Sequence, residues 1–478
     1  MKIGIVIDHH QRDLNGYLAL INKILSEKNY EIYLINLYHL YEIYLIDVDL
    51  VILHNSRPEN LYIIRDLKKL KKKIVIIDNE GVPFGWSKGD EHIKQFINNI
   101  KSSLEYVEAY IVWSNYIKNL MENEKLETNK IYVLGNQRFE LFKNKFSYLY
   151  KKRKTVKKVI VINTNTPNSN PQFTSIEKDK NDIKKKLYYK LDNSDQLLDE
   201  VLKNNRIIFE NYLKLIENVL NDFRHHKIIL NVHPFEDKKI YKKLFSKKKN
   251  ILILNNNFNL PQLYNNYDLI VQYNSTTCAE TLLNGKKSIS VNFVDPNNIV
   301  NEFYREFCVN VNDYSTLKSL IDDKKKLEDE IYKINDQTKK ILNYVYHNGS
   351  NDAIELISNL INQIIFNHQK IKIRKILKYF YFIKYFLSFN YNKIDIAVIP
   401  KRILKLLLIF LINSQNFYKL KLLLKNNYKK KHMSIKKHEK FFLKLNKNSN
   451  NKFKFFYTKP SFLRIIFRNL ITIKIKIL

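Results

Sequence analysis

Short apolar runs that alternate with amphipathic segments are the feature that most constrains the fold of this chain. The first run, Lys2–Ile7, is followed by apolar residues at helical spacing over Leu14–Lys28, and the alternation then continues. We expect strands at residues 2–7, 31–37, 49–54, 73–77, 109–113, 131–134, 159–162, 228–232, 251–254, 268–272 and 287–291. Because helical segments separate most of these strands, the pattern predicts βαβ units and parallel sheets.

A polar, basic stretch at residues 143–158 interrupts the alternation, which restarts at Val159. We therefore predict two Rossmann-like, doubly wound α/β domains, at residues 1–150 and 155–368, that face each other across a cleft. The interrupting stretch would be the hinge between them. In sheets of this class, ligands bind at the carboxyl ends of the strands, so the polar residues that follow each strand are the candidate site residues.

The positive charge of the chain is concentrated in its last quarter. The 478 residues contain 82 Lys and Arg against 47 Asp and Glu, and residues 370–478 hold 28 of these basic residues with only two acids. Basic and apolar residues interleave there, as in Lys372–Lys384, which predicts a mainly helical, amphipathic tail that binds an anionic membrane surface. A solvated tail of biased composition and a nucleic-acid-binding tail are the alternatives, although no nucleic-acid motif accompanies the charge.

Other features indicate the compartment. The two cysteines, Cys278 and Cys308, exclude a disulfide framework and are typical of a reducing compartment. No run of about 18 apolar residues is present, and Met1–Asp8 lacks the long apolar region of a signal peptide. We expect a cytoplasmic protein that is peripheral on the inner face of the cytoplasmic membrane.

Neither a cofactor nor a metal ion is predicted. The G-x-G-x-x-G and P-loop patterns are absent, and the chain has only 8 glycines. The carboxylates of Asp47 and Asp49 come at the beginning of their strand and not after it, which places them at the wrong end of the sheet for a metal–nucleotide site. No His/Cys group has the spacing of zinc ligands.

The strongest local pattern runs from Asp268 to Val291, where a strand leads through a polar turn into a helix. Ser275, Thr276 and Thr277 would lie at the start of that helix, where backbone N–H groups favour an anion. This arrangement predicts a phosphate site built without glycine, with Glu280 near enough to accept hydrogen bonds from ribose hydroxyls. The alternative is an ordinary helix cap with a solvated glutamate.

Ionisable side chains that could bind a phosphate or act as a base follow two further predicted strands. His233 and Pro234 follow a predicted strand, so the imidazole would lie at the ligand edge of the sheet and could hold a phosphate. Asp78 and Glu80 flank Asn79 just before Gly81, and a carboxylate at the end of a buried strand is well placed as a general base. A loop histidine and a solvated acidic turn are the respective alternatives.

These residues resemble motifs of bacterial surface-carbohydrate biosynthesis proteins (capsule or lipopolysaccharide) with the GT-B glycosyltransferase architecture, related to the capsule Kdo transferases. The resemblance covers residues 1 to about 350, and five motifs follow in the same order. They are Asn79-Glu-Gly81, Gly135-Asn-Gln-Arg-Phe-Glu140, Asn163-Thr-Asn165, His233-Pro-Phe-Glu236 and Ser275-Thr-Thr-Cys-Ala-Glu-Thr-Leu-Leu-Asn-Gly-Lys-Lys-Ser-Ile289.

The resemblance implies a GT-B-like, metal-independent glycosyltransferase that moves a sugar from a CMP-, CDP- or UDP-linked donor to a surface-polysaccharide or lipid-linked glycan. Glu80 and His233 would be catalytic, with Glu80 as the base. Donor-binding residues would be Asn163, Thr164, Asn165, His233, Pro234, Asn274, Ser275, Thr276, Thr277 and Glu280. Acceptor-side residues would be Asp8, Asp78, Gly81, Gly135, Asn136 and Arg138.

Two other functions remain open on the sequence alone. A phosphotransferase that uses a CDP-polyol donor in cell-surface polymer synthesis could use the same His-Pro and Ser/Thr elements. A non-enzymatic nucleic-acid-binding or scaffold protein would explain the charge without explaining the strand-end motifs.

Overall fold

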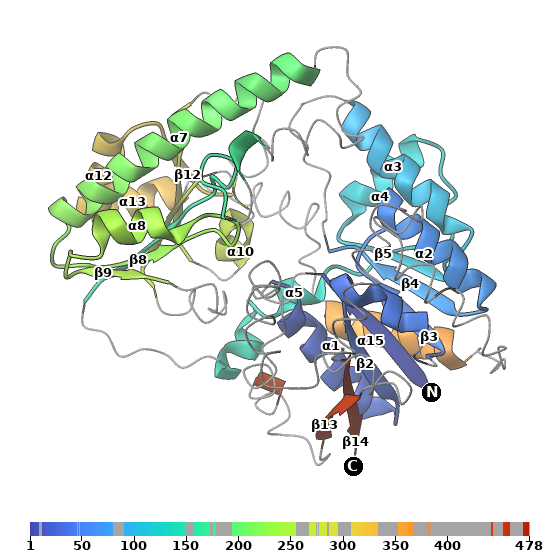
Figure 1. Ribbon diagram of the computed structural model, residues 1–478. Helices are drawn as coiled ribbons and strands as arrows, with labels where there is room; N and C mark the ends of the chain where they lie inside the picture. Colours follow the sequence, from blue (N-terminus) through green and yellow to red (C-terminus); the bar gives the residue numbers. More distant parts are fainter. Residues whose placement is uncertain are drawn as a thin grey trace, which may run out of the picture. The chain divides into compact units, whose positions relative to one another are not determined.

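The computed structural model of the chain describes residues 1–8, 12–44, 46, 48–79, 90–149, 157–172, 175–177, 194–254, 267–273, 275, 277–283, 286–294, 307–332, 352–366, 381, 441–442, 453–458 and 472–477. The chain divides into two compact units (Figure 1). Unit 1 contains Met1–Pro83, Ile93–Glu140 and Tyr344–Leu478, and unit 2 contains Phe84–His92 and Leu141–Asn343. Each unit is built on its own sheet.

The sheet of unit 1 has a parallel, doubly wound core. Its parallel strands are β1 (Lys2–Ile7), β2 (Glu31–Asn36), β3 (Leu50–Leu53), β4 (Lys73–Ile77), β5 (Ala109–Val112) and β6 (Ile131–Val133). They lie in the order β2-β1-β3-β4-β5-β6. Ile, Val and Leu fill these strands and are almost entirely buried, as expected where helices cover both faces of a parallel sheet.

Helices surround this sheet. They are α1 (Leu14–Glu27), α2 (Pro58–Lys69), α3 (Asp90–Leu104), α4 (Asn115–Asn123) and the short α5 (Gln137–Glu140), with a 3-10 segment at Leu37–Tyr44. Helix α15 (Ala353–Phe366) comes from much later in the chain and packs beside α1 (Figure 1). There the Glu27 carboxylate accepts hydrogen bonds from Ser358 Oγ at 3.0 Å and Asn362 Nδ2 at 2.7 Å, which fixes α15 on unit 1.

Two strands from the basic tail extend the same sheet. β14 (Thr472–Ile477) pairs antiparallel with β2, and β13 (Phe453–Thr458) pairs antiparallel with β14. The prediction of a mainly helical tail was therefore wrong for these two segments. The physical reason is visible in Thr472-Ile-Lys-Ile-Lys-Ile477, where apolar and basic residues alternate with the period of two that a strand requires.

Unit 2 contains a second parallel sheet of six strands. They are β7 (Val159–Asn163), β8 (Lys227–Asn231), β9 (Ile251–Ile253), β10 (Leu269–Gln272), β11 (Ser288–Val291) and β12 (Val309–Val311), in the order β12-β11-β10-β7-β8-β9. Its helices are α7 (Ser194–Asp222), α8 (Lys238–Phe245), α10 (Thr277–Leu283), α12 (Tyr314–Asp322) and α13 (Lys324–Tyr332), and Asn144–Leu149 is a 3-10 segment. Tyr212, Ile216 and Val219 of α7 pack into the core formed with the strands.

Two elements of unit 2 differ from the sequence pattern. The apolar spacing over residues 314–347 predicts one helix, but α12 ends at Asp322 and α13 begins at Lys324. The helices separate because Asp323 is extended and its carboxylate caps the second helix through the N–H of Lys326. Strand β12 was missed, since Val-Asn-Val is too short to show a period. The predicted helix at residues 260–265 lies outside the described residues.

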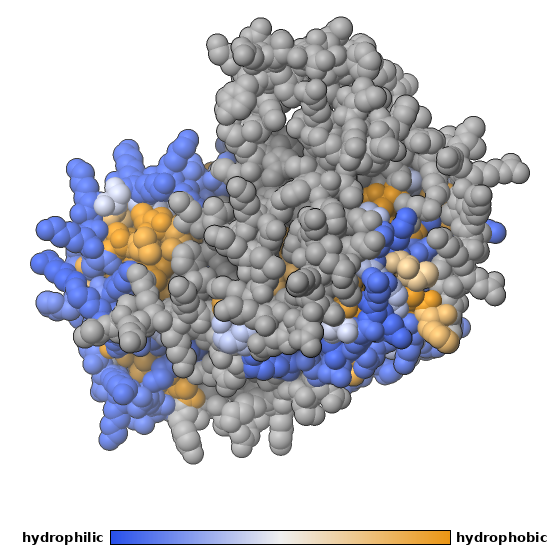
Figure 2. Space-filling view, turned by 90° about the horizontal axis from the view of Figure 1, so that it is seen from below, coloured by the Kyte–Doolittle hydropathy of each residue, from blue (hydrophilic) through white to orange (hydrophobic). Residues whose placement is uncertain are grey.

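Apolar side chains are also found at the surface of unit 2. Ile240 and Leu244 on α8 and Leu252 on β9 are 36–50% exposed. On the face of the molecule shown in Figure 2, apolar side chains lie among hydrophilic ones. In the part of the chain that the structure describes, no helix combines the length and the apolar character needed to cross a bilayer.

Candidate active site

The strand order of unit 2 defines where a ligand would bind. β8 and β9 follow β7 in sequence on one side of it, and the chain then returns so that β10 pairs with β7 on its other side. The direction of strand addition therefore reverses between β7 and β10. In open α/β sheets, the crevice at the carboxyl ends of two such strands is the usual ligand site.

Predicted donor-binding residues meet at this reversal. Asn163 ends β7, and its Nδ2 donates a hydrogen bond to Thr277 Oγ1, the first residue of α10, at 3.4 Å. Asn165 Nδ2 donates to the carbonyl of Tyr273, just after β10, at 3.4 Å. Asn231, at the end of β8, donates through Nδ2 to Asn163 Oδ1 at 2.8 Å. Three strand ends are thus joined by amide side chains, and the role of Asn231 was not predicted.

The turn before α10 is organised by hydroxyl groups. Ser275 Oγ lies 2.9 Å from Thr277 Oγ1 and accepts a hydrogen bond from the Thr277 N–H at 3.3 Å. Glu280 is only 3% exposed, so the alternative of a solvated glutamate is excluded, whereas its predicted contact with a ribose stays a prediction. Helix α10 begins at Thr277. Asn274 and Thr276 lie outside the described residues.

His233 is held by the backbone around it. Its N–H donates to Thr164 Oγ1 at 2.9 Å, and its ring nitrogen Nδ1 accepts from the N–H of Phe235, the residue after Pro234, at 3.3 Å. Because Nδ1 is an acceptor, the neutral imidazole carries its proton on Nε2. The ring is therefore set up as a hydrogen-bond donor through Nε2.

Glu236, from the same His-Pro segment, points inward. Its side chain is fully buried, its Oε1 accepts from the Thr166 N–H at 2.7 Å, and its Oε2 accepts from Tyr241 Oη at 2.5 Å. Burial raises the pKa of this carboxyl group, and the hydrogen bonds oppose the rise. The spacing His-Pro-x-Glu was visible in the sequence, but the direction of the side chain was not.

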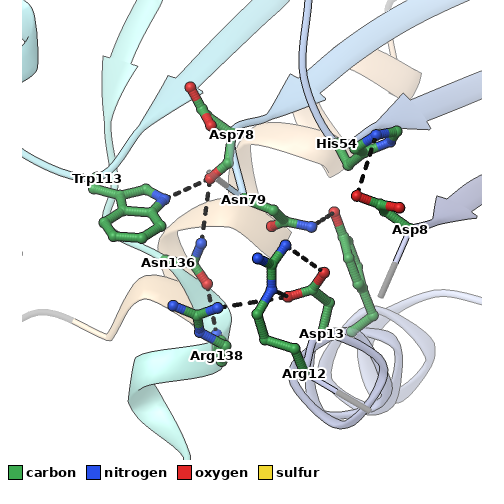
Figure 3. Close-up of polar contacts among 10 residues, drawn as sticks. Asp8, Arg12, Asp13, His54, Asp78, Asn79, Trp113, Asn136 and Arg138 are labelled. Atoms are coloured by element: carbon green, nitrogen blue, oxygen red, sulfur yellow. Dashed lines mark hydrogen bonds and ion pairs between the residues drawn. The ribbon is translucent and has the colours of Figure 1, made fainter. Parts of the chain in front are cut away.

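The sheet of unit 1 has its own reversal point, between β1 and β3. Asp8 follows β1 and His54 follows β3, and their Oδ2 and Nε2 atoms lie 3.8 Å apart (Figure 3). Asp8 was predicted as an acceptor-side residue. His54, which is 2% exposed, was not assigned a role, although it too follows a strand directly.

Asp78, at the end of β4, is a centre of buried hydrogen bonds. Its carboxylate accepts from Tyr110 Oη at 3.3 Å. Its carbonyl accepts from Trp113 Nε1 and from Asn136 Nδ2 (Figure 3). Burial, and next the Asp78 carboxylate, raise the pKa of Tyr110 well above its usual value. Glu80 and Gly81 lie outside the described residues, so the assignment of Glu80 as the base stays a prediction.

Arg138 lies at the start of α5 beside this centre. Gly135 takes a positive φ of 80°, which suits glycine, and the turn brings the Arg138 N–H within 2.8 Å of Asn136 Oδ1. The guanidinium lies over the rings of Trp113 and Phe139, with its Nη1 3.7 Å from Asp13 Oδ1.

Asp13 joins this group to a second arginine. Arg12 reaches the Asp13 carboxylate with two hydrogen bonds of 2.7 and 3.0 Å (Figure 3). Neither residue was singled out from the sequence, because nothing in its local pattern connects Asp13 with Arg138.

Comparison with known proteins gives the fold. No protein-family model and no curated protein sequence matches the chain. A variant of the wall teichoic acid polymerase TagF is 12% identical, with coverage of 77% of this chain and 89% of that chain and a TM-score of 0.50. MnaA of S. aureus, solved with UDP, is 12% identical over 78% of this chain and 98% of that one, with a TM-score of 0.48. The UDP-GlcNAc 2-epimerase of Methanocaldococcus jannaschii is 15% identical, with coverage of 76% of this chain and 100% of that chain and a TM-score of 0.46.

The fold is GT-B. The predicted class, two Rossmann-like α/β domains, is confirmed, and the strand orders of both sheets agree with it. The predicted cleft between the domains, and the acceptor and donor roles given to them, stay predictions. Among the described residues of this GT-B chain, no group of three or more His, Cys, Asp or Glu side chains is placed to hold a metal ion.

Proposed function

We propose that this GT-B protein is a glycosyltransferase of surface-polymer synthesis, which moves a sugar from a nucleotide-sugar donor to a polysaccharide or lipid-linked glycan. The observation that carries the proposal is the gathering of Asn163, Thr277 and their partners at the reversal point of unit 2. A reversal point lined with hydrogen-bond donors suits a nucleotide diphosphate or monophosphate.

In the donor complex, the phosphate would be held by neutral donors. The His233 ring would donate through Nε2, and the hydroxyls of Ser275 and Thr277 would supply further hydrogen bonds. Glu280 would accept from the ribose. Fixed donors of this kind stabilise the charge that develops on the leaving phosphate as the glycosidic bond to the nucleotide breaks.

Unit 1 would bind the acceptor. Glu80 would remove the proton from the acceptor hydroxyl as its oxygen attacks the anomeric carbon, and Asp78, Asn136 and Arg138 would form the surrounding frame. The mutual hydrogen bonds of that frame support this role, because a rigid surround keeps a base in position.

The basic tail would keep the enzyme at the inner face of the cytoplasmic membrane, close to lipid-linked acceptors. Residues 370–478 contain 28 basic and two acidic residues, and this positive charge supports the proposal. Each Lys or Arg near an anionic surface contributes about 1 kcal/mol to binding.

A second candidate function is transfer of a polyol phosphate from a CDP-polyol donor. The likeness of the fold to a teichoic acid polymerase favours keeping it. The two functions differ in the bond that breaks: a glycosyltransferase cleaves between sugar and phosphate, whereas a phosphotransferase cleaves within the diphosphate and makes a new phosphodiester.

Product analysis tests the proposal. The intact chain is incubated with CMP-, CDP-, UDP- and GDP-linked donors and membrane-derived acceptors, and the new linkage is read by mass spectrometry and phosphorus NMR. A glycosidic bond supports the first function and a phosphodiester the second.

Glu80→Gln should abolish transfer and leave donor binding intact, with exposed Glu122→Gln on α4 as the matched control. Full transfer by Glu80→Gln would show that Glu80 is not the base.

A further inference from the structure

The Glu236 carboxylate is buried and connects two other elements, although the residue lies in the loop after β8. One oxygen accepts a hydrogen bond from the Thr166 N–H, in the loop after β7, and the other accepts from Tyr241 Oη, in α8. A carboxylate is costly to bury unless both oxygens have donors, and both do.

The two loops are joined on either side of Glu236. The Gln172 N–H donates to the Phe235 carbonyl at 2.8 Å, and the Asp237 N–H donates to the Asn170 carbonyl at 2.9 Å. Asn170 Nδ2 donates in turn to the Asp237 carbonyl at 2.9 Å. Residues 164–172 and 231–237 therefore form one hydrogen-bonded body, which we call the loop pair, with Glu236 at its buried centre.

His233 takes its orientation from the loop pair. Its N–H is bonded to Thr164 in one loop, and its Nδ1 accepts from Phe235 in the other. The bond to Nδ1 settles the tautomer, because a nitrogen that accepts a hydrogen bond cannot also carry the proton. The bond to Thr164 crosses between the loops and would break if they moved apart. The bond to Nδ1 lies within residues 233–235, so it depends on the backbone conformation of the segment that Glu236 anchors.

We infer that Glu236 is the positioning residue of the donor site: by binding Thr166 and Tyr241 it locks the loop pair, and the lock holds His233 with its proton on Nε2, directed at a phosphate oxygen. Glu236 itself does not contact the donor. The inference deepens the proposed function and rests on it for the identity of the ligand, although the tautomer of His233 is a property of the chain alone.

The chemistry of the side chain selects informative variants. In Glu236→Gln, the amide oxygen still accepts from Thr166 and the amide nitrogen donates to Tyr241 Oη, so the lock is kept. In Glu236→Ala, two buried donors lose their acceptor. Tyr241→Phe removes one of the two bonds and is the milder variant if Glu236→Ala fails to fold. The exposed Glu210→Gln on α7 is the matched control.

A double-mutant cycle with His233→Ala separates positioning from general stability. The affinity of the intact chain for UDP, CDP and CMP is measured by calorimetry in both backgrounds. We expect Glu236→Ala, or Tyr241→Phe in its place, to weaken binding about tenfold when His233 is present and less than twofold when it is absent, since residues that act through one another couple. Glu236→Gln should recover most of the affinity. Equal losses in the two backgrounds would overturn the inference.

Nitrogen NMR of histidine-labelled protein gives a readout that needs no ligand. The His233 signals are identified by their loss in His233→Ala, and they should show a protonated Nε2 and an accepting Nδ1 in the wild type and in Glu236→Gln. A mixture of tautomers is expected in Glu236→Ala or Tyr241→Phe. An unchanged tautomer in both would overturn the inference even if nucleotides bind. A chain that binds no nucleotide but shows the tautomer change would contradict the proposed function instead.

Discussion

Gly16 joins the first helix to the segment that carries Arg138, and its replacement by alanine tests that contact. A Cβ at Gly16 would lie 2.9 Å from both the backbone N and Cα of Arg138 and 3.2 Å from the carbonyl carbon of Gln137. These are backbone atoms, so no rotamer change relieves the contact. Helices α1 and α5 would have to separate.

The expected magnitude follows from two opposing terms. Alanine is favoured over glycine inside a helix by about 1 kcal/mol. Overpacking costs about 1–3 kcal/mol, and the upper end applies because the neighbours are backbone. We therefore expect Gly16→Ala to lower the free energy of unfolding of unit 1 by about 2 kcal/mol, combining these values.

Urea unfolding followed by circular dichroism measures the change, with Gly4→Ala as the control. At Gly4 a Cβ would meet only side-chain atoms of Val48 and Ile35, at 3.3 Å or more, and the loss should stay below about 1 kcal/mol. If Gly16→Ala is as stable as the wild type, or more stable, the close packing of α1 against Gln137 and Arg138 of α5 is wrong.

Three further predictions concern the site and the tail. Thr277→Val should weaken nucleotide binding, whereas Thr277→Ser should not, because the serine keeps the hydroxyl that accepts from Asn163. If calorimetry finds the affinity of both variants unchanged, Thr277 does not belong to the site. Burial raises the folded-state pKa of Glu236 above its unfolded value, so its contribution to stability is fully present below the unfolded pKa and is lost as pH rises through the folded one. Glu236→Gln should thus gain stability relative to the wild type as the pH rises from about 4, the ordinary pKa of glutamate, and the gain should level off above the raised folded-state pKa. Thermal unfolding that shows a pH-independent difference would contradict the shift. Replacing Lys372, Arg374 and Lys375 by Gln should weaken binding to anionic vesicles about 100-fold in a flotation assay, at about 1 kcal/mol each, and unchanged binding would refute the role of the tail.

The tail variants should leave the last two strands in place. β14 pairs with β2 at the edge of the unit 1 sheet, so removing residues 370–478 would expose that edge as well as remove charge. Point substitutions at residues 372, 374 and 375 remove charge and leave β13 and β14 in the chain. A truncated chain that leaves the vesicles is therefore informative only if its thermal unfolding matches that of the full chain.

The sequence predicted the fold well because its signal is local. Runs such as Ile74–Ile77 and Val159–Ile162 are short, β-branched and bounded by polar residues, which is enough to place buried parallel strands. The break between α12 and α13 was missed because Asp323 acts through its own backbone conformation and cap, which a continuous helical period conceals.

The site was predictable only where residues follow strands directly. Asn163, His233 and Asp78 could be found this way, since the carboxyl ends of parallel strands share one edge. The inward direction of Glu236 and the contact of Asp13 with Arg138 depend on packing between segments far apart in the chain. No local pattern in the sequence encodes such contacts.

The account depends most directly on nucleotide binding at the reversal point of unit 2. Calorimetric titration of the intact chain with CMP, CDP, UDP and GDP, repeated with His233→Ala, measures it. We predict that at least one nucleotide binds with measurable heat and that His233→Ala weakens its affinity about tenfold, as expected for the loss of a hydrogen bond to a charged group. The account would be contradicted if none of the four nucleotides binds, or if His233→Ala binds them with the same affinity as the wild type.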